Sequence, residues 1–322
     1  MNPIRTMRLA VLAACVATIP ITVAAQGAPT RIVVGGPGGG NTDIAARLVS
    51  ERFAQVLGTP VIVENRPGAG GVVAAEFVKN AKPDGTTIGL VTASNAANET
   101  IMRSKSYSLV ADLEPVGLYA WLANVLIVTP SIKAGSVAEL ADELKALGNT
   151  NYSSGGVGSP GHLSGETYRL RTGAPMNHIP YKGAPPAVLS VVTGETVLMF
   201  ATASAALPQI RAGKVRALAV TSSSRLTELP DVPTFGQAGL ANFDVRDWVG
   251  FVVPRGTTAA TIDKLHRAFS EAFADPAVRD RLEKSTMLIA SPALGPDAFR
   301  RFLADDVAKW AKTVREAGIP LQ

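Results

Sequence analysis

The sequence predicts an α/β fold of two lobes built on mixed, mostly parallel sheets. Short apolar runs rich in β-branched residues alternate with segments of helical periodicity, which is typical of such folds. A strand, a glycine-rich turn and a helix start follow one another three times, around residues 35–43, 67–71 and 155–160. Two extended apolar passages, 115–129 and 243–254, are long enough to carry the chain between lobes.

The first 25 residues have the pattern of a secretory signal peptide. Arg5 and Arg8 precede a nearly continuous apolar stretch, and small residues end at Ala25 before Gln26. A lipobox ending at Cys15 is the alternative, and it would make the protein a lipoprotein. The apolar run before Cys15 is shorter than an export signal needs, so we expect cleavage after Ala25 and an exported mature chain.

The composition excludes several classes of function. Lys and Arg total 31 against 26 Asp and Glu, and they are dispersed, without the basic stripe of a nucleic-acid binder. Cys15 is the only cysteine, so the mature chain has no disulfide, thiolate nucleophile or thiolate metal site. No later apolar run approaches the roughly 20 residues that span a bilayer. A mature chain of about 300 residues exceeds one typical core, which favours two lobes.

The first part of the mature chain contains three expected strands and two expected helices. The strands are expected at residues 31–35, 60–64 and 87–91, and the helices at 42–57 and 72–79. Asn41 is a natural N-cap for the first helix.

Strands and helices continue to alternate through the middle of the chain. The strands are expected at 151–153, 177–181, 197–201 and 215–221, and the helices at 136–147, after 159, after 185 and at 205–212. Ser159 as N-cap and Pro160 as first helical residue occupy the positions that they favour.

Three further helices are expected at the end of the chain, at 258–274, 276–284 and 296–317. Because two extended passages flank the middle segment, we expect a first lobe that resumes after an inserted second one. The expected boundaries place residues 26–125 and 247–322 in lobe 1 and residues 126–246 in lobe 2.

The three glycine-rich turns predict a site for a small anion. Glycine allows a sharp turn and a close approach of the ligand to the backbone. A helix start adds unpaired N–H groups and the positive end of the helix dipole. Ligands of such sheets bind beyond the carboxyl ends of the strands, where all three turns lie, so we expect them around one cleft between the lobes.

Other chemistries match the sequence poorly. Gly36-Pro37-Gly38 after the first strand and Glu64 after the second leave an NAD(P)-dependent dehydrogenase-like, dinucleotide-binding enzyme as the alternative, although Asn41 stands where the third glycine belongs. No phosphate-binding P-loop motif occurs. The sequence around Ser159 lacks the first glycine of a hydrolase nucleophile elbow.

Metal ligands and cofactor sites are not indicated either. His162, His178 and His266 are far apart in sequence and form none of the paired spacings of histidine metal sites. What remains is an anion pocket without catalytic machinery, so we expect a binding protein that uses no cofactor and no metal.

Eight motifs in a fixed order resemble one known family over essentially the whole mature chain. They are PGGGNTD (37–43), ENRPGAGG (64–71), KPDGTTIGL (82–90), NYSSGGVGSPGHLSGE (151–166), HIPYKGAPPA (178–187), LPQIRAGKVRALAVTSSSR (207–225), LPDVPTFGQAG (229–239) and WVGFVVPRGTT (248–258). The ordered set resembles the substrate-binding proteins of tripartite tricarboxylate transporters, the TctC or Bug family.

The resemblance implies a periplasmic receptor of the two-lobed, Venus-flytrap type (a type II-like periplasmic-binding-protein fold). Such a receptor closes as a monomer on a small carboxylated solute, without a cofactor. Its implied partners are the membrane subunits of a tripartite tricarboxylate-type transporter, or a sensor protein.

The resemblance also implies the residues of the pocket. Family pockets hold a ligand carboxylate through loop N–H groups, hydroxyls and ordered water. Matched to this sequence, the implied residues are Gly38, Gly39, Asn41, Thr42, Asp43, Ser94, Asn95, Ser154, Gly158, Ser159, His162 and Thr202.

Several of these residues have a structural alternative. Ser159 is also a natural helix cap, and Ser94 and Asn95 are also typical turn residues. Asp43 would repel a carboxylate, so we expect it to hold its own loop and first helical turn, or to meet a ligand amine. His162, near a positive helix end, is expected to be neutral, either packed or in contact with the ligand.

Two departures from the family pattern bear on the ligand. Ala201-Thr202 stand where many relatives carry an acid that holds an ammonium group, which favours dicarboxylates, hydroxy acids or aromatic acids over amino acids. Gly35 replaces a bulkier residue and predicts a roomier pocket. Lys182 is either a solvated loop residue or a partner for a distal carboxylate.

Overall fold

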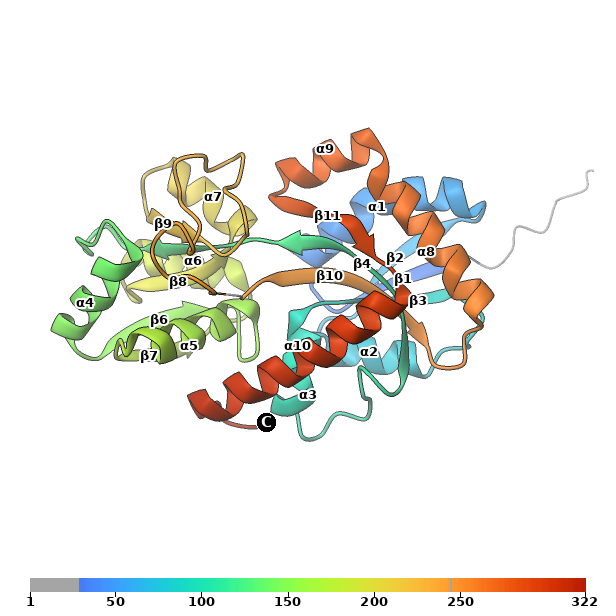
Figure 1. Ribbon diagram of the computed structural model, residues 1–322, viewed down its shortest axis with the longest axis horizontal. Coiled ribbons are helices and arrows are strands. Elements are labelled where there is room, and N and C mark those ends of the chain that lie inside the picture. Colours follow the sequence, from blue (N-terminus) through green and yellow to red (C-terminus); the bar gives the residue numbers. More distant parts are fainter. Residues whose placement is uncertain (1–28, 244) are drawn as a thin grey trace, which may run out of the picture.

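Two sheets flanked by helices form the body of the computed structural model, which describes residues 29–243 and 245–322 (Figure 1). The predicted signal peptide and Cys15 lie outside the described residues. In Figure 1 one sheet lies to the left and the other to the right, with extended chain running between them. The expected two-lobed α/β architecture is therefore confirmed.

The first sheet, sheet A, has six strands in the order β11-β4-β10-β3-β1-β2. They are β1 (Thr30–Val34), β2 (Val61–Asn65), β3 (Thr87–Val91), β4 (Leu113–Leu122), β10 (Asp247–Pro254) and β11 (Met287–Leu294). The helical elements connected to them are α1 (Asn41–Leu57), η1 (Ala69–Gly71), α2 (Val72–Lys79), α3 (Ala93–Ile101), α8 (Ala259–Ala274), α9 (Pro276–Lys284) and α10 (Pro296–Ala317).

The second sheet, sheet B, has five strands in the order β7-β6-β8-β5-β9. They are β5 (Asn124–Val128), β6 (Thr150–Ser154), β7 (Met176–Pro180), β8 (Leu198–Thr202) and β9 (Arg216–Val220). The helices between them are α4 (Val137–Leu147), α5 (Pro160–Thr172), α6 (Ala184–Thr193) and α7 (Ala203–Arg211).

Both sheets are mixed. In sheet A, β1 is parallel to β2 and β3, and in sheet B, β6 is parallel to β7 and β8. The strands nearest the lobe crossings are antiparallel to their neighbours: β10 to β3 and β4, β11 to β4, and β5 to β8 and β9. The parallel pairs therefore lie at one end of each sheet, where the glycine-rich turns follow them.

The two extended passages that the sequence predicts are where the chain changes sheet. Only Ala123 separates β4 of sheet A from β5 of sheet B, and β10 begins at Asp247 after the return. On this basis we propose residues 26–125 and 247–322 as lobe 1 and residues 126–246 as lobe 2.

Three local expectations were wrong. Gly40, not Asn41, is the N-cap of α1, and Asn41 is already helical. The helix α3 was not expected: Ser94 and Asn95, for which a turn was the alternative to ligand contact, lie in its first helical turn, after the N-cap Thr92. The strand β11 was not expected, and its register with β4 is interrupted between Ile289 and Leu294, which breaks the alternation that marks a strand.

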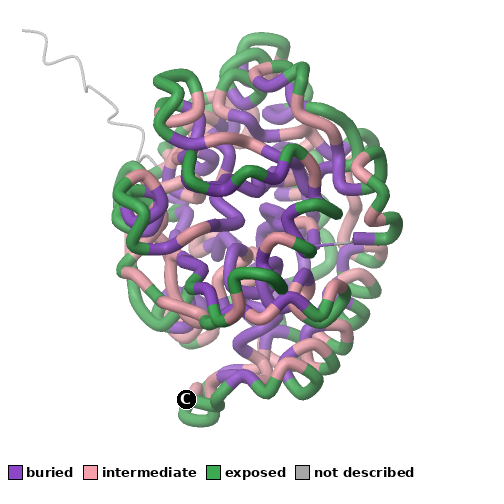
Figure 2. Tube along the Cα trace, turned by 90° about the vertical axis from the view of Figure 1, so that its left-hand side faces the viewer, coloured by how far each residue is buried: buried purple, intermediate pink, exposed green. Residues whose placement is uncertain are grey.

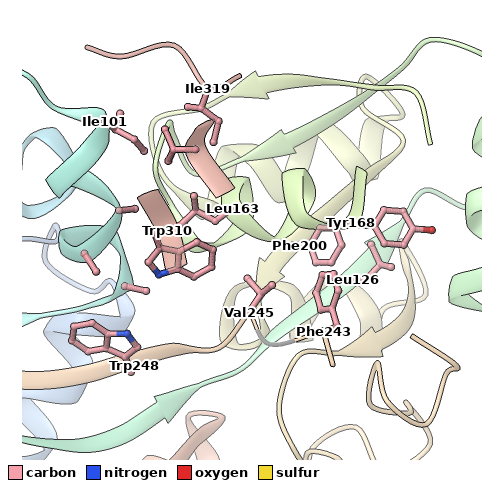
Figure 3. Packing of buried hydrophobic residues seen from close by; sticks show 14 of the residues in the cluster. Ile101, Leu126, Leu163, Tyr168, Phe200, Phe243, Val245, Trp248, Trp310 and Ile319 are labelled. Atoms are coloured by element: carbon pink, nitrogen blue, oxygen red, sulfur yellow. The ribbon is translucent and has the colours of Figure 1, made fainter. Parts of the chain in front are cut away.

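One buried apolar cluster continues from lobe 1 into lobe 2. It includes Ile101 at the end of α3, Trp310 of α10, Leu163 of α5 and Phe200 of β8 (Figure 3). In Figure 2 the buried segments, in purple, run through the interior, and the outermost turns are mostly exposed. The last turn of α10 thus packs on lobe 2, and Arg169 donates to the Ala317 carbonyl at 2.9 Å.

Among the described residues, no helix is both long enough and apolar enough to cross a membrane.

Candidate functional site

A cleft of about 640 Å³ lies between the lobes, at the carboxyl ends of the parallel strands. From lobe 1 it is lined by the turns after β1, β2 and β3, and from lobe 2 by the loops after β6 and β7. All three glycine-rich turns contribute to it, at Gly36, Gly70 and Gly155 among others. Its volume lies in the range of pockets for small ligands.

Asp43 holds the turn after β1 in place. Its nearly buried carboxylate accepts the Gly39 N–H at 2.8 Å and the Arg47 Nε–H at 2.9 Å. Burial acts to raise the pKa of the Asp43 carboxyl, but the hydrogen bonds from Arg47 and Gly39 outweigh it and hold the pKa below its ordinary value. The Asp43 carboxylate is therefore occupied by its own loop and first helical turn, in agreement with the expectation.

Two buried amides of α3 hold the turn after β2. Asn98 Nδ2 donates to the carbonyls of Ala69 and Gly70 at 3.1 and 3.2 Å. Asn95 Nδ2 is 3.4 Å from the Gly71 carbonyl, and its Oδ1 accepts the Thr92 N–H at 3.0 Å. Asn95 and Asn98 are only 3% and 2% exposed. The chain needs this support because Gly70 and Gly71 have φ of 61° and 95°, in the left-handed region.

Ser94 and Thr42 present hydroxyls to the cleft from lobe 1. Both line it, at the first turns of α3 and α1. The Ser94 hydroxyl has no hydrogen-bond partner among residues 29–243 and 245–322. Unlike the amide of Asn95, it is therefore available to a ligand.

On the lobe 2 side, Ser159 and Lys182 line the cleft. Ser159 is the N-cap of α5, and its Oγ accepts the His162 N–H at 3.3 Å, which leaves its hydroxyl proton for a ligand oxygen. Lys182 is exposed and is the one charged side chain among the described residues that line the cleft. The cleft thus combines hydroxyl donors with a single cation and suits a small anion.

Two stacked imidazoles support the loop after β6 from behind. The rings of His162 and His178 lie 3.8 Å apart at their centroids. His162 Nδ1 accepts the Gly158 N–H at 3.1 Å, and His178 Nε2 is 2.6 Å from Ser154 Oγ. The Ser154 hydroxyl also accepts the Gly156 N–H at 3.1 Å. These residues shape the loop and do not line the cleft.

Both imidazoles are neutral at ordinary pH. Burial lowers the pKa of His162 to about 4. Burial, together with repulsion from His162, lowers the pKa of His178 to about 3, although Glu166 acts in the opposite direction. A neutral ring is also what the contact at Gly158 requires, because a protonated Nδ1 has no lone pair to accept that N–H.

The lobes also touch each other beside the cleft. Ser204 Oγ donates to Asn41 Oδ1 at 2.6 Å, joining α7 to α1. Gly158 of lobe 2 lies so close to Asn98 of lobe 1 that a Cβ at Gly158 would be 2.9 Å from Asn98 Oδ1. The described arrangement is therefore one in which the lobes are closed at these points.

The predicted site residues fall into two groups. Those that line the cleft are Thr42, Ser94, Asn95 and Ser159. Those that are not among its lining residues are Gly38, Gly39, Asn41, Asp43, Ser154, Gly158, His162 and Thr202.

The sequence did not indicate that Asn98 supports the turn after β2 or that His178 supports the loop after β6. The Asn98 side chain forms hydrogen bonds with residues 28 and 29 positions away, and no local sequence pattern predicts such contacts. Within the described residues, no group of three or more His, Cys, Asp or Glu side chains is arranged to hold a metal ion.

Comparison with known proteins agrees with this geometry. The profile of the family described as "Tripartite tricarboxylate transporter family receptor" matches residues 45–319. Protein BugT of Bordetella pertussis (strain Tohama I) is 36% identical over 327 residues, covering 98% of this chain and 99% of the relative.

Two solved structures are similar in both fold and sequence. The periplasmic binding protein BugD superposes with a TM-score of 0.80 at 31% identity, covering 91% of this chain and 99% of BugD. MatC from Rhodopseudomonas palustris, solved with bound malate, has a TM-score of 0.78 at 30% identity, covering 89% of this chain and 98% of MatC.

Proposed function

The chain belongs to the tripartite tricarboxylate transporter receptor family, and from that premise we propose that it captures a small carboxylate in the cleft between its lobes. The proposed ligand is a di- or tricarboxylate, a hydroxy acid or an aromatic acid. The proposed site of action is the periplasm, and the proposed partners are the membrane subunits of a tripartite tricarboxylate-type transporter.

Family membership also decides between a receptor and an enzyme. The family consists of periplasmic solute-binding receptors, not enzymes. The dinucleotide-binding dehydrogenase that the sequence left as an alternative is therefore not supported.

The observation that carries the ligand proposal is the lining of the cleft. Ser94 and Ser159 place hydroxyls on opposite walls, and Lys182 supplies one positive charge. Hydrogen bonds to a carboxylate are about twice as strong as those between neutral groups. The bound malate of MatC supports a ligand with more than one oxygen-bearing group.

Binding would favour closure because the ligand touches both lobes. Only a ligand that interacts differently with open and closed forms shifts the balance between them. A carboxylate held by Ser94 of lobe 1 and Ser159 of lobe 2 meets that condition, since the two hydroxyls converge only when the lobes approach.

A thermal-shift screen of residues 26–322 tests the proposal. The screen compares mono-, di- and tricarboxylates, aromatic acids, amino acids and NAD. A ligand at a hundred times its Kd adds about 2.7 kcal/mol to the free energy of unfolding, so we expect a clear rise with one class of carboxylate and none with NAD. Stabilisation by NAD alone, or by no carboxylate, would contradict the proposal.

Titration calorimetry of two variants then tests the residues. Ser159→Ala and Ser94→Ala each remove a hydroxyl from one wall, and we expect each to weaken binding of the carboxylate about tenfold. Ser131→Ala is the matched control, because Ser131 is exposed outside the cleft. Unchanged affinity in both cleft variants would refute the assignment of these hydroxyls.

A further inference from the structure

A second cavity, of about 460 Å³, lies between the lobes at a distance from the cleft. The cleft adjoins strands β3, β1 and β2 of sheet A and β7 and β6 of sheet B. The second cavity adjoins β11 and β4 of sheet A and the loop after β9 of sheet B, which is the opposite end of each sheet order. The crossing strands β4, β5 and β10 therefore separate the two spaces.

Three arginines from three parts of the chain line this cavity. Arg225 comes from the loop after β9 in lobe 2, Arg246 from the passage before β10, and Arg279 from α9 in lobe 1. Two acids accompany them, and one of these, Glu228, is paired with Arg211. Positive charge thus prevails in a space that both lobes enclose.

Arg279 is the side chain that most clearly lacks a counter-ion. It is half-buried on α9 and forms no ion pair or side-chain hydrogen bond with any residue that the structure describes. Arg225 uses two of its five N–H groups, on Gln237 Oε1 and the Pro230 carbonyl. Guanidinium donors therefore remain on both sides of the cavity.

Neutral donors complete the lining. Ser223 and Ser224 lie on one wall and Ser291 on the other. The hydroxyls of the neighbouring Ser222 and Thr286 are already used, because they donate to the Ser224 and Ser285 carbonyls. The backbone N–H groups of residues 222–225 form no hydrogen bond within the described part of the chain. Successive free N–H groups of a turn are a common feature of anion sites.

We propose that this cavity is a second binding site, distinct from the cleft, for a small doubly charged oxyanion of the phosphate or sulfate type. Arg279 and Arg225 would hold the anion from the two lobes, because the fork of a guanidinium matches two oxygens of such an anion. The hydroxyls of Ser223, Ser224 and Ser291 would hold its remaining oxygens. The site depends on neither the identity nor the presence of the carboxylate ligand.

Trp121 provides a readout inside the cavity. It lines the space half-buried, and the Arg246 guanidinium lies 4.5 Å from the centre of its ring. The other two tryptophans do not line the cavity: Trp248, opposite Trp121 in the register of β10 and β4, and Trp310 are fully buried, and both donate to Asp306. An anion that engages Arg246 will therefore change the emission of Trp121, and the variant Trp121→Phe identifies that part of the signal.

The experiment titrates the mature protein, residues 26–322, with inorganic phosphate and with sulfate at constant ionic strength. We expect saturable quenching or enhancement that Trp121→Phe abolishes. Arg279→Gln is expected to weaken the binding of the anion about tenfold. Arg281→Gln is the matched control, because Arg281 lies exposed on the same helix and does not line the cavity.

A calorimetric titration with Ser159→Ala separates the two sites. Anion binding that is unchanged in Ser159→Ala and weakened in Arg279→Gln supports the second site. Binding that Ser159→Ala weakens and Arg279→Gln leaves intact places the anion in the cleft and overturns the proposal. The absence of binding by both anions overturns it as well, whatever the outcome of the carboxylate screen.

Discussion

The two walls of the cleft hold their glycine-rich turns by different chemistry. On the lobe 1 side, the amides of Asn95 and Asn98 donate to carbonyls of the turn at residues 69–71. On the lobe 2 side, the His162 imidazole accepts the Gly158 N–H, and Ser154 backs the same loop. An amide donates at any ordinary pH, whereas an imidazole accepts only while its nitrogen is unprotonated.

This difference shows that each glycine-rich turn depends on a buried side chain that holds it by hydrogen bonds. Glycine is required at Gly70, Gly71 and Gly158 because each has a positive φ, but glycine alone leaves the chain free. The supporting side chains remove that freedom. The predictions below disturb first the contact between the walls, then the support of the lobe 1 wall, then that of the lobe 2 wall.

Gly158→Ala should have the largest effect, because it acts where the walls meet. Gly158 has a φ of 73°, which costs alanine about 1–2 kcal/mol. Its new Cβ would also lie 2.9 Å from Asn98 Oδ1 and 3.2 Å from Ile101 Cδ1 of the other lobe. We expect a loss of stability and, since closure is obstructed, at least about a tenfold loss of carboxylate affinity by calorimetry.

Gly173→Ala is the control that separates the backbone cost of a positive φ from the contact of the new Cβ with the other lobe. Gly173 ends α5 with a φ of 67°, so alanine has a similar backbone cost, but a Cβ there meets nothing within 4 Å. We expect this control to lower the melting temperature without lowering affinity. Equal affinities for the two variants would mean that the contact between Gly158 and Asn98 does not take part in closure.

Asn98→Ala should have the next largest effect. The substitution removes the buried amide that donates to the carbonyls of the exposed residues Ala69 and Gly70, at a cost of about 1 kcal/mol in the free energy of unfolding. Chemical denaturation measures the loss. Asn80→Ala is the control: Asn80 also donates through Nδ2, to the Glu76 carbonyl, but it is exposed, so its loss should stay within about 0.5 kcal/mol.

The sequence predicted elements best where local signals mark their ends. The helix that begins at Pro276 and the one that begins at Pro296 were expected with the bounds that the structure has, because proline favours the first helical position. The helix α3 was missed because its first residues, Ala93-Ser94-Asn95, read as a turn. Their polar groups instead complete a capping box with Thr92, a choice that tertiary packing decides.

The position of the site was easier to predict than the role of each residue in it. That the three turns surround one cleft follows from the rule on strand ends, and they do so here. Whether a side chain faces the cleft or supports the wall depends on distant partners. Asn95 and Ser154 were both expected to bind ligand, yet their polar groups are engaged by Gly71 and His178. Such pairings join residues 24 apart and have no signature in one sequence.

A change in pH dependence is expected from the lobe 2 wall. His162 and His178 have pKa values lowered by burial to about 4 and about 3, so between pH 6.5 and those values the unfolded chain binds more protons than the folded one. The free energy of unfolding should therefore fall as the pH falls through this window. Asp247 acts oppositely, because burial raises its pKa to about 7 and its folded form keeps a proton that the unfolded chain loses.

His178→Asn tests this balance, since asparagine can still meet Ser154 but does not titrate. Removing one titrating imidazole should make the slope of stability against pH shallower, by at most about 1.4 kcal/mol per pH unit. Asp247→Asn should make the same slope steeper, because it removes the opposing group. Denaturation midpoints of the wild type and both variants, measured from pH 7 to pH 4.5, give the three slopes to be compared. Parallel curves for the wild type and His178→Asn would mean that His178 already carries its proton in the folded protein, and that the two walls do not differ in their response to acid.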